Sequence, residues 1–373
     1  MSKQSLVLFA CGDVGPIHEP MDGYSELARA TLAAADLRFA QVERVYSDRG
    51  ALQVHSGGSH SRVQPHMASV FDDCGFDVLS VASNHAMDWG PEAMLDTVEL
   101  FRRKGKHVVG AGRNLREARL PAVVERNGVR VAFLAYCSVL REGYAAGPKT
   151  PGIAPLRART YYEPAEYQAG VPPKVVTVPY EEDVEGMMED IAAAKKSAHA
   201  VVVSLHWGIH FIPRMIADYQ TTAAKAAFAA GADLILGHHA HVPKAIGVYG
   251  GKVCFYSLSN FIMSSPAHDA AKAAAFAQRY GVTADPDYPH LPYGTDGKRS
   301  LIAKAVISAA GVERASFLPV VIDKKLRPEP LRPEDPRFND AVNYMEWASA
   351  GYDHRFTTEG GEVRISAGER GAG

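Results

Sequence analysis

The sequence lacks any long apolar run. Its longest apolar stretches, such as residues 129–135 and 200–205, are much shorter than the roughly 20 residues that a membrane-spanning helix needs. The first residues lead directly into the apolar segment 6–11, without the longer apolar region and cleavage site of a secretory signal. We therefore expect a cytoplasmic protein that is not associated with a membrane.

An excess of charge of either sign is also missing. The 373 residues include 40 Lys plus Arg and 42 Asp plus Glu, which gives a formal net charge of -2. Without a block of basic residues, nothing in the sequence favours nucleic acid or an anionic lipid surface as a partner. The 47% of hydrophobic residues is typical of a globular protein with one large core or two smaller ones.

Cysteine is sparse. The four cysteines, Cys11, Cys74, Cys137 and Cys254, stand alone within apolar segments. This distribution favours buried thiols over disulfides or a thiolate metal site.

The apolar runs that are present alternate with Ala-rich helical stretches, which is the pattern of an α/β domain with strands covered on both faces. The predicted strands are residues 5–10, 37–42, 77–82, 107–109, 200–205 and 233–236. The predicted helices are residues 24–35, 91–104, 183–197 and 215–230. Three hairpins are predicted around Asn127-Gly128, Gly250-Gly251 and Gly311. The result is a mixed sheet, or two packed sheets, covered by helices.

Residues 1–325 are expected to form the main domain. Two segments without a clear period, residues 141–180 and 264–300, are predicted to be irregular insertions, although the second begins with an Ala-rich helix. Residues 326–373 are predicted to be a C-terminal extension with one helix at 337–348 and a loose Gly-rich tail.

The side chains that can bind metal ions follow the predicted strands. They are Asp13, Glu43, Asn84 with His85, His206, and the cluster His238-His239-Ala240-His241. Because ligands gather at the carboxyl ends of strands in an open α/β sheet, we expect these side chains to converge.

Each residue also has a simpler explanation. Asp13 is suited to capping a turn, Glu43 to a solvated surface, and His206 to a core position with satisfied hydrogen bonds. The histidine cluster is harder to explain in this way. Alternate residues of an extended chain point to the same side, which would direct His239 and His241 together. Taken jointly, the residues favour a metal site.

The ligand types narrow the choice of ion. A set of carboxylates, an amide and imidazoles without thiolate suits Mn, Fe, Zn or Co. If a carboxylate bridges, the set can hold two ions about 3.5–4 Å apart, and the leading hypothesis is a dinuclear hydrolase in which hydroxide on the metal attacks the substrate. His85 is then available to protonate the leaving group, and Asp88 to orient its imidazole.

These residues belong to motifs that resemble a known family. The motifs are Gly12-Asp13-Val14, Ala35-Asp36-Leu37 leading to Glu43, Ser83-Asn84-His85-Ala86-Met87-Asp88-Trp89-Gly90, His206-Trp207-Gly208, Gly237-His238-His239-Ala240-His241 and Phe255-Tyr256-Ser257-Leu258-Ser259-Asn260-Phe261. In this order they resemble the CapA-type poly-γ-glutamate capsule synthesis family. That family is similar to the calcineurin-like metallophosphoesterases, which implies two mixed β-sheets sandwiched between helices over roughly residues 5–325.

The resemblance also implies a role for each residue. Asp13 and His241 would hold one ion, Glu43 would bridge both ions, and a second ion would be held by Asn84, His206 and His239. His85 would be the acid or would contact the substrate.

Three positions depart from the superfamily pattern. Gly15 stands where an Asp-x-His motif has its histidine, which leaves open whether one or two ions bind and whether His18 compensates. Gln41-Val42-Glu43 replaces the family's Asn-Leu-Glu, and His210 replaces the acidic residue after His-Trp-Gly.

Four basic residues are candidates for recognising an anionic substrate: Arg49, Arg62, His66 and His210. Guanidinium groups suit carboxylate or phosphate, and the alternative is that these residues are solvated loop charges.

The leading hypothesis is a metal-dependent hydrolase of a small or oligomeric anionic substrate. The scissile bond is either an amide of the γ-glutamyl type or a phosphoester, since the same metal chemistry serves both. The alternative is a non-catalytic capsule-assembly or binding protein that keeps the fold. A homo-oligomer is compatible with either hypothesis.

Overall fold

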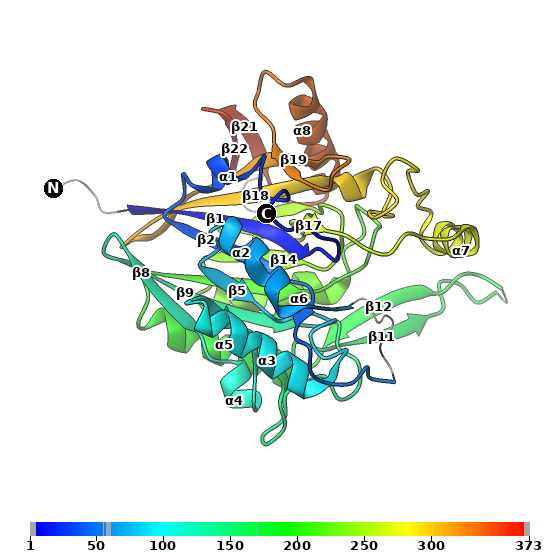
Figure 1. The fold of residues 1–373 in the computed structure, drawn as a ribbon, viewed down its shortest axis with the longest axis horizontal. Coiled ribbons are helices and arrows are strands. Elements are labelled where there is room, and N and C mark those ends of the chain that lie inside the picture. The colour runs from blue at the N-terminus through cyan, green and yellow to red at the C-terminus, as the bar shows by residue number, and fades with distance from the viewer. Residues whose placement is uncertain (1–4, 55, 57–60, 169, 369–373) are drawn as a thin grey trace.

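The structure is a computed structural model that describes residues 5–54, 56, 61–168 and 170–368. Within these ranges two β-sheets pack face to face and helices cover their outer faces (Figure 1). Both sheets contain parallel and antiparallel pairs. The predicted class of two mixed sheets sandwiched between helices is therefore confirmed.

The larger sheet has ten strands, with β1 near its middle. In spatial order it contains β21 (Arg355–Glu359), β22 (Glu362–Ser366), β19 (Gly311–Ile322), β18 (Arg299–Ser308), β1 (Ser5–Gly15), β2 (Leu37–Val42), β5 (Val78–Ser80) and β6 (His107–Val109), with β17 (Asn260–Met263) paired to β1 and β20 (Pro328–Pro330) paired to β19. β1 runs parallel to β2 and β17 and antiparallel to β18.

The second sheet has six strands. Its order is β15 (Ile246–Tyr249), β16 (Lys252–Phe255), β14 (Leu234–His238), β13 (Ala200–His206), β9 (Val129–Cys137) and β8 (Ala122–Arg126). Three short pairs lie outside the two sheets: β3 (Val45–Tyr46) with β4 (Arg62–Val63), β7 (Ala111–Gly112) with β10 (Gly152–Ile153), and β11 (Ala158–Glu163) with β12 (Lys174–Pro179).

Eight α-helices accompany these strands in the described part of the chain. They are α1 (Arg29–Leu32), α2 (Ser69–Asp73), α3 (Gly90–Arg103), α4 (Leu115–Ala118), α5 (Glu181–Lys195), α6 (Asp218–Ala229), α7 (Ala270–Tyr280) and α8 (Pro336–Ser349). None of these described helices has both the length and the apolar character that crossing a bilayer requires.

Strand alternation produces the layers. Along β1, Leu6 and Leu8 point into the core between the two sheets, whereas Phe9 and Cys11 point outward into a second core that includes residues of α2. A third core joins the outer face of the six-stranded sheet to α5 and α6. Because side chains alternate between the two faces of a strand, one apolar run supplies two cores.

The structure departs from the sequence-based expectation in three segments. The predicted helix at 24–35 is helical only over α1, because the residues before it form turns such as Glu26 N–H to Gly23 O. The segment 141–180 is more regular than expected, since it contains β10 and the β11–β12 hairpin, which projects from the body in Figure 1. Within 264–300 the expected Ala-rich helix is α7.

The C-terminal segment is also more ordered than the predicted loose tail. It contains the expected helix as α8, and β21 and β22 then extend the ten-stranded sheet through pairing of β22 with β19. Alternating apolar residues such as Val363 and Ile365 are buried there, so hydrophobic burial fixes this segment. The Gly-rich end, residues 369–373, lies outside the described residues.

Two glycines allow the sheets to approach neighbouring backbone where the site lies. A Cβ on Gly12 would stand 1.9 Å from the carbonyl oxygen of Ser259, and one on Gly237 would stand 2.2 Å from that of Tyr256. Asp13 N–H donates to the same Ser259 oxygen at 2.9 Å. Close packing at position 12 therefore holds Asp13 in place.

We expect Gly12→Ala to destabilise the protein by about 1–3 kcal/mol or more, because overpacking against fixed backbone forces the strand to move. Gly23→Ala is the matched control, since a Cβ there meets nothing within 4 Å. Urea denaturation of both variants measures the difference. Equal stabilities would show that β1 shifts at no cost.

Candidate metal centre

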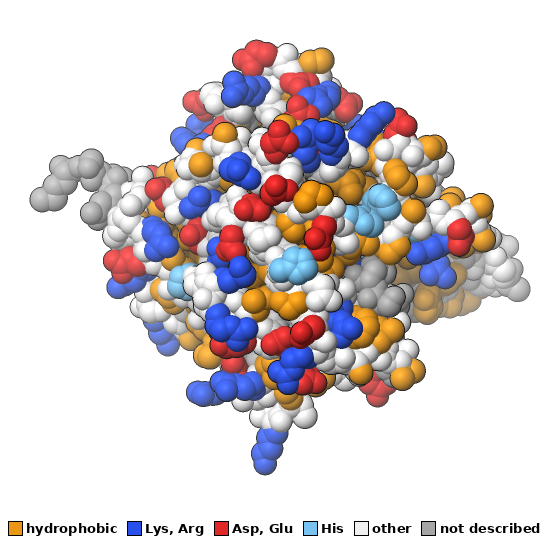
Figure 2. Space-filling model, in the orientation of Figure 1, with side chains coloured by type: hydrophobic (Ala, Val, Ile, Leu, Met, Phe, Trp, Pro, Cys, Tyr) orange, Lys and Arg blue, Asp and Glu red, His pale blue; other side chains and the backbone are white. Residues whose placement is uncertain are grey.

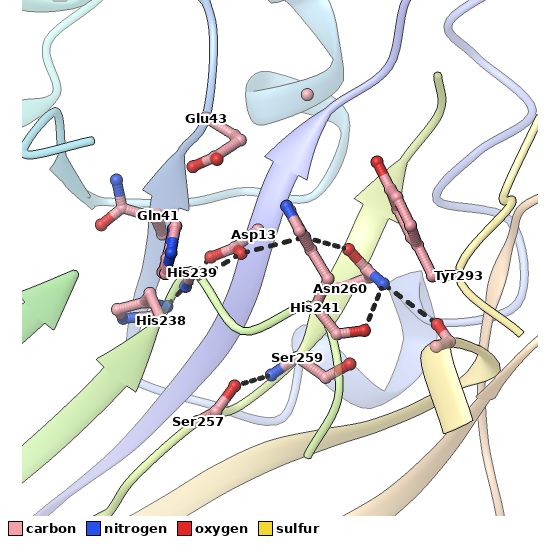
Figure 3. Close-up of polar contacts among 12 residues, drawn as sticks. Asp13, Gln41, Glu43, His238, His239, His241, Ser257, Ser259, Asn260 and Tyr293 are labelled. Carbon is pink, nitrogen blue, oxygen red and sulfur yellow. Dashed lines mark hydrogen bonds and ion pairs between the residues drawn. The ribbon is translucent and has the colours of Figure 1, made fainter. Parts of the chain in front are cut away.

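The ends of five strands bring the predicted ligands into one buried region. β1 carries Asp13, β2 leads to Glu43, and β13 ends at His206. Asn84 follows β5, and His239 and His241 follow β14. None of these six side chains is more than 7% exposed. Figure 3 shows Asp13, Glu43, His239 and His241 in this region.

One group of ligand atoms is compact enough for a single ion. Asp13, Glu43 and His206 each offer one atom, and these atoms lie within 4.8 Å of one another. Asn84 Oδ1 lies 2.7 Å from His206 Nε2 and 3.3 Å from His239 Nδ1. The convergence predicted from the strand ends is therefore present for all five side chains.

His241 lies on the other side of Asp13. Its Nδ1 is 3.5 Å from Asp13 Oδ2 and is hydrogen-bonded to Asn260 Oδ1 at 2.8 Å. Asn260 also donates to the carbonyl oxygens of His241 and Gly297, and Figure 3 shows Asn260 beside His241. In the sequence Asn260 stands out only as part of a motif. In the structure it orients the His241 ring.

Several buried polar atoms in this region lack a hydrogen-bond partner among the described residues. They are Asp13 Oδ1, Glu43 Oε1, His206 Nδ1 and both ring nitrogens of His238. Buried polar groups without partners are rare and costly. A cation among the two carboxylates would satisfy their oxygens, so the residues present fit a divalent metal ion.

The protonation states support the same conclusion. Burial, followed by the charges of neighbouring histidines, lowers the pKa of His206 and of His239 well below the usual value. Both rings are therefore neutral, which is the form that binds metal. Burial and the nearby Asp13 raise the pKa of Glu43 well above its usual range. A cation close to this carboxylate would favour its ionised form.

The histidine cluster reaches the site by a route that differs from the predicted one. His239 and His241 have φ values of 87° and 56°, in the left-handed region that residues other than glycine rarely adopt. The chain after β14 is thus not extended, so the prediction that His239 and His241 point together because they alternate along a strand was wrong. The two rings still reach the site, His239 at Asn84 and His241 at Asp13. Such strained residues are concentrated at functional sites.

A hydrogen-bonded group lies beside the ligands. His85 Nδ1 is 2.6 Å from Asp88 Oδ2, and Tyr144 Oη donates to Asp88 Oδ1 at 2.9 Å. Burial alone would raise the pKa of Asp88, but the hydrogen bonds from His85 and Tyr144 and the charge of His85 outweigh it and lower the pKa. Asp88 is therefore an anion held against His85 Nδ1, and its role in orienting His85 during a reaction stays a prediction.

Sequence analysis did not identify Tyr144 or Arg141 as part of this group. Arg141 Nη1 lies 3.9 Å from Asp88 Oδ1, and its side chain is partly exposed. Both residues lie in the segment that showed no clear period, so the sequence contained no signal that places them near Asp88.

The four predicted substrate-binding residues are separated in the structure. Arg49 pairs with Glu92 and His66 pairs with Glu19, both at exposed positions, and Arg62 stacks on Trp89. Their role in substrate binding stays a prediction. His210 is at the centre, because its ring centroid is 3.7 Å from that of His239. His18 Nε2 lies 3.0 Å from His290 Nδ1, so the His18 ring contacts that of His290.

The fold and this site define a two-sheet α/β protein with a buried centre suited to a divalent cation. The family model described as bacterial capsule synthesis protein PGA_cap matches residues 7–265, and the chain belongs to this family. The resemblance found in the motifs is thereby confirmed.

Relatives with assigned names include two CapA proteins. The chain is 36% identical over 204 residues to the PGA biosynthesis protein CapA of Bacillus subtilis (strain 168), which covers 54% of this chain and 47% of that protein. It is 30% identical over 207 residues to the capsule biosynthesis protein CapA of Bacillus anthracis, covering 54% and 44%. The matched region thus spans about half the length of each relative.

Two solved structures show weaker similarity. A putative 5'-nucleotidase from Staphylococcus aureus has a TM-score of 0.44 at 14% identity and covers 92% of this chain and 58% of that one. The calcineurin-like phosphoesterase YfkN from Bacillus subtilis has a TM-score of 0.42 at 12% identity and covers 93% and 99%.

The buried histidines predict a pH-dependent stability of the metal-free protein. Because their folded pKa values are lowered, the unfolded chain binds more protons below about pH 6.5. The contribution of these histidines to the free energy of unfolding should be fully present above this pH. It should be lost as the pH decreases through their lowered pKa values in the folded protein. Each histidine contributes up to about 1.4 kcal/mol per pH unit. Glu43 has the opposite effect on stability. Its pKa is raised in the folded protein, so the folded chain holds this proton more tightly than the unfolded chain does.

Urea denaturation of the metal-free protein between pH 7.5 and about pH 5.5 tests this prediction. The variant His206→Gln should reduce the slope by up to about 1.4 kcal/mol per pH unit. A slope that is the same in His206→Gln and wild type contradicts the assignment.

Proposed function

We propose that this protein is a divalent-metal-dependent hydrolase that acts on an anionic substrate. The observation that carries the proposal is the placement of a buried, partly unsatisfied ligand set beside the His85–Asp88 pair. His85 lies close enough for its charge to contribute to lowering the pKa of His206 and His239. A binding protein would need the ligands but has little use for an oriented proton donor next to them.

A bound divalent ion would supply a Lewis acid and lower the pKa of a coordinated water. The residues of the chain then divide the remaining tasks. Asp88 accepts a hydrogen bond from the Nδ1–H of His85 and fixes the tautomer, so Nε2 is the atom that exchanges a proton with the substrate. Tyr144 holds the other oxygen of Asp88. His85 is thus set to protonate a leaving group.

Family membership suggests the class of substrate. The two relatives described above are named for PGA biosynthesis and for capsule biosynthesis. A γ-glutamyl chain is anionic and is cleaved at an amide bond, which a hydrolytic centre of this kind can attack. Arg141, partly exposed near Asp88, is placed to attract a carboxylate. We therefore propose a γ-glutamyl amide as the substrate class, with phosphoesters as the second class to be assayed.

Removal and return of metal tests the proposal. Purified protein is treated with a chelator, desalted, and supplied with Mn, Zn or Fe in separate reactions. γ-Glutamyl oligomers and phosphoesters are assayed in parallel. We expect hydrolysis of at least one class to be lost on chelation and restored by one of these ions. Metal binding without turnover on either class would favour a non-catalytic capsule protein.

The variant His85→Ala should lower kcat by about 10²–10⁴-fold, as expected for loss of a general acid, while the protein keeps its metal. Asp88→Asn should lower kcat and shift the pH–rate profile, because the neutral amide no longer fixes the His85 tautomer. The matched control is His354→Ala, which removes a histidine that pairs with Glu346 at 3.0 Å outside the site. Full activity in His85→Ala would rule out its role as the acid.

A further inference from the structure

Arg44 is a buried cation at the centre that sequence analysis did not consider. Its side chain is only 2% exposed, although arginine is rarely buried in proteins. It directly follows Glu43, and its Nε donates to the carbonyl oxygen of Gly15 at 2.6 Å. A second nitrogen of the guanidinium donates to the carbonyl oxygen of Ser264. The guanidinium is therefore held in one place beside the end of β1.

The stem of Arg44 fills the space that a side chain at position 15 would need. A Cβ on Gly15 would lie 3.0 Å from Arg44 Cγ and 3.1 Å from Arg44 Nε. The φ of Gly15 does not require glycine, because it is outside the left-handed region. Met263 Sδ would lie at 3.1 Å, so Arg44 and Met263 together crowd position 15. A histidine there would have to push the arginine stem aside.

Ligands are unevenly distributed around Asp13. On one side, Glu43 and His206 approach it closely, and Asn84 and His239 complete that group. On the other side, the rings of His238 and His241 lie 3.3 and 3.5 Å from the Asp13 carboxylate. His239 contacts this carboxylate only through its backbone N–H. Tight protein sites for transition metals generally use at least three protein ligands. Asn84, His206 and His239 provide three ligands on the first side without Asp13 or Glu43, whereas His238 and His241 provide two on the other side.

The charges point the same way. Asp13 and Glu43 carry two negative charges when ionised, and Arg44 carries one positive charge, since a guanidinium stays protonated in proteins. The positive charge of Arg44 acts on the neighbouring Glu43 carboxylate. One divalent ion leaves a single positive charge, which one anionic ligand neutralises. A second divalent ion would place two further charges near a fixed cation in a buried, weakly screened region.

We propose that the centre holds one divalent ion, on the side of Glu43, Asn84, His206 and His239, and that Arg44 provides a permanent positive charge in place of a second ion. This inference rests on the proposed metal centre and deepens it. It replaces the expectation of a dinuclear site. It also assigns Gly15 and Arg44 a joint role, in which the absent side chain makes room for the cation.

The test is the metal content of the full chain. Wild type, Arg44→Lys and the double variant Gly15→His/Arg44→Ala are equilibrated with Mn, desalted and analysed for metal per chain by elemental analysis and calorimetric titration. We expect about one equivalent for wild type and Arg44→Lys. The double variant, which adds a ligand and removes the charge, should bind about two. Electron paramagnetic resonance should show an isolated Mn ion in wild type and a coupled pair in the double variant.

A second arginine–glycine pair provides the control. Arg119 packs on Gly186, donates to its carbonyl oxygen and pairs with Asp190, but it contacts none of the ligands. The double variant Gly186→His/Arg119→Ala should retain one equivalent. Wild type with two equivalents overturns this inference and leaves the hydrolase proposal intact, whereas wild type with none overturns both. Wild-type stoichiometry decides the matter even if the Arg44 variants fail to fold.

Discussion

The structure depends on the burial of two carboxylates, Asp13 and Glu43, within a few ångströms of several neutral imidazoles. Both carboxylates are at most 1% exposed, and each has an oxygen without a hydrogen-bond partner among the described residues. Such an arrangement is unfavourable in an apolar interior unless a cation compensates it. The surrounding fold therefore has to tolerate an electrostatic cost that only a ligand relieves.

The two packed sheets make this cost tolerable. Asp13 is held by backbone contacts to Ser259 and His239, and Glu43 by Ser83. Three hydrophobic cores, one between the sheets and two on their outer faces, stabilise the strands that carry Asp13 and Glu43. Figure 2 shows acidic and basic side chains interspersed on the visible face, in keeping with the net charge of -2.

Much of the fold follows from local patterns. Short apolar runs predicted β2 and β6, and the 3.6-residue spacing of apolar residues predicted most of α3, α5 and α6, because burial of apolar side chains determines those elements. The patterns were less informative where contacts distant in sequence decide the structure. β21 and β22 form because β19 offers an edge, and the β11–β12 hairpin forms in a segment rich in Pro, Gly and Tyr. No periodicity within such segments reveals a pairing partner.

The sequence by itself determined which residue types follow the strands, and parallel strands deliver their carboxyl ends to one edge. This was sufficient to predict that Asp13, Glu43, Asn84 and the histidines converge. The tertiary structure alone decided which atoms face one another and what lies between them. It placed Tyr144 and Arg141 behind His85, gave His239 and His241 their left-handed backbone, and packed Arg44 against Gly15. These features depend on side-chain packing between segments far apart in the chain, and spacing along one strand contains no information about it.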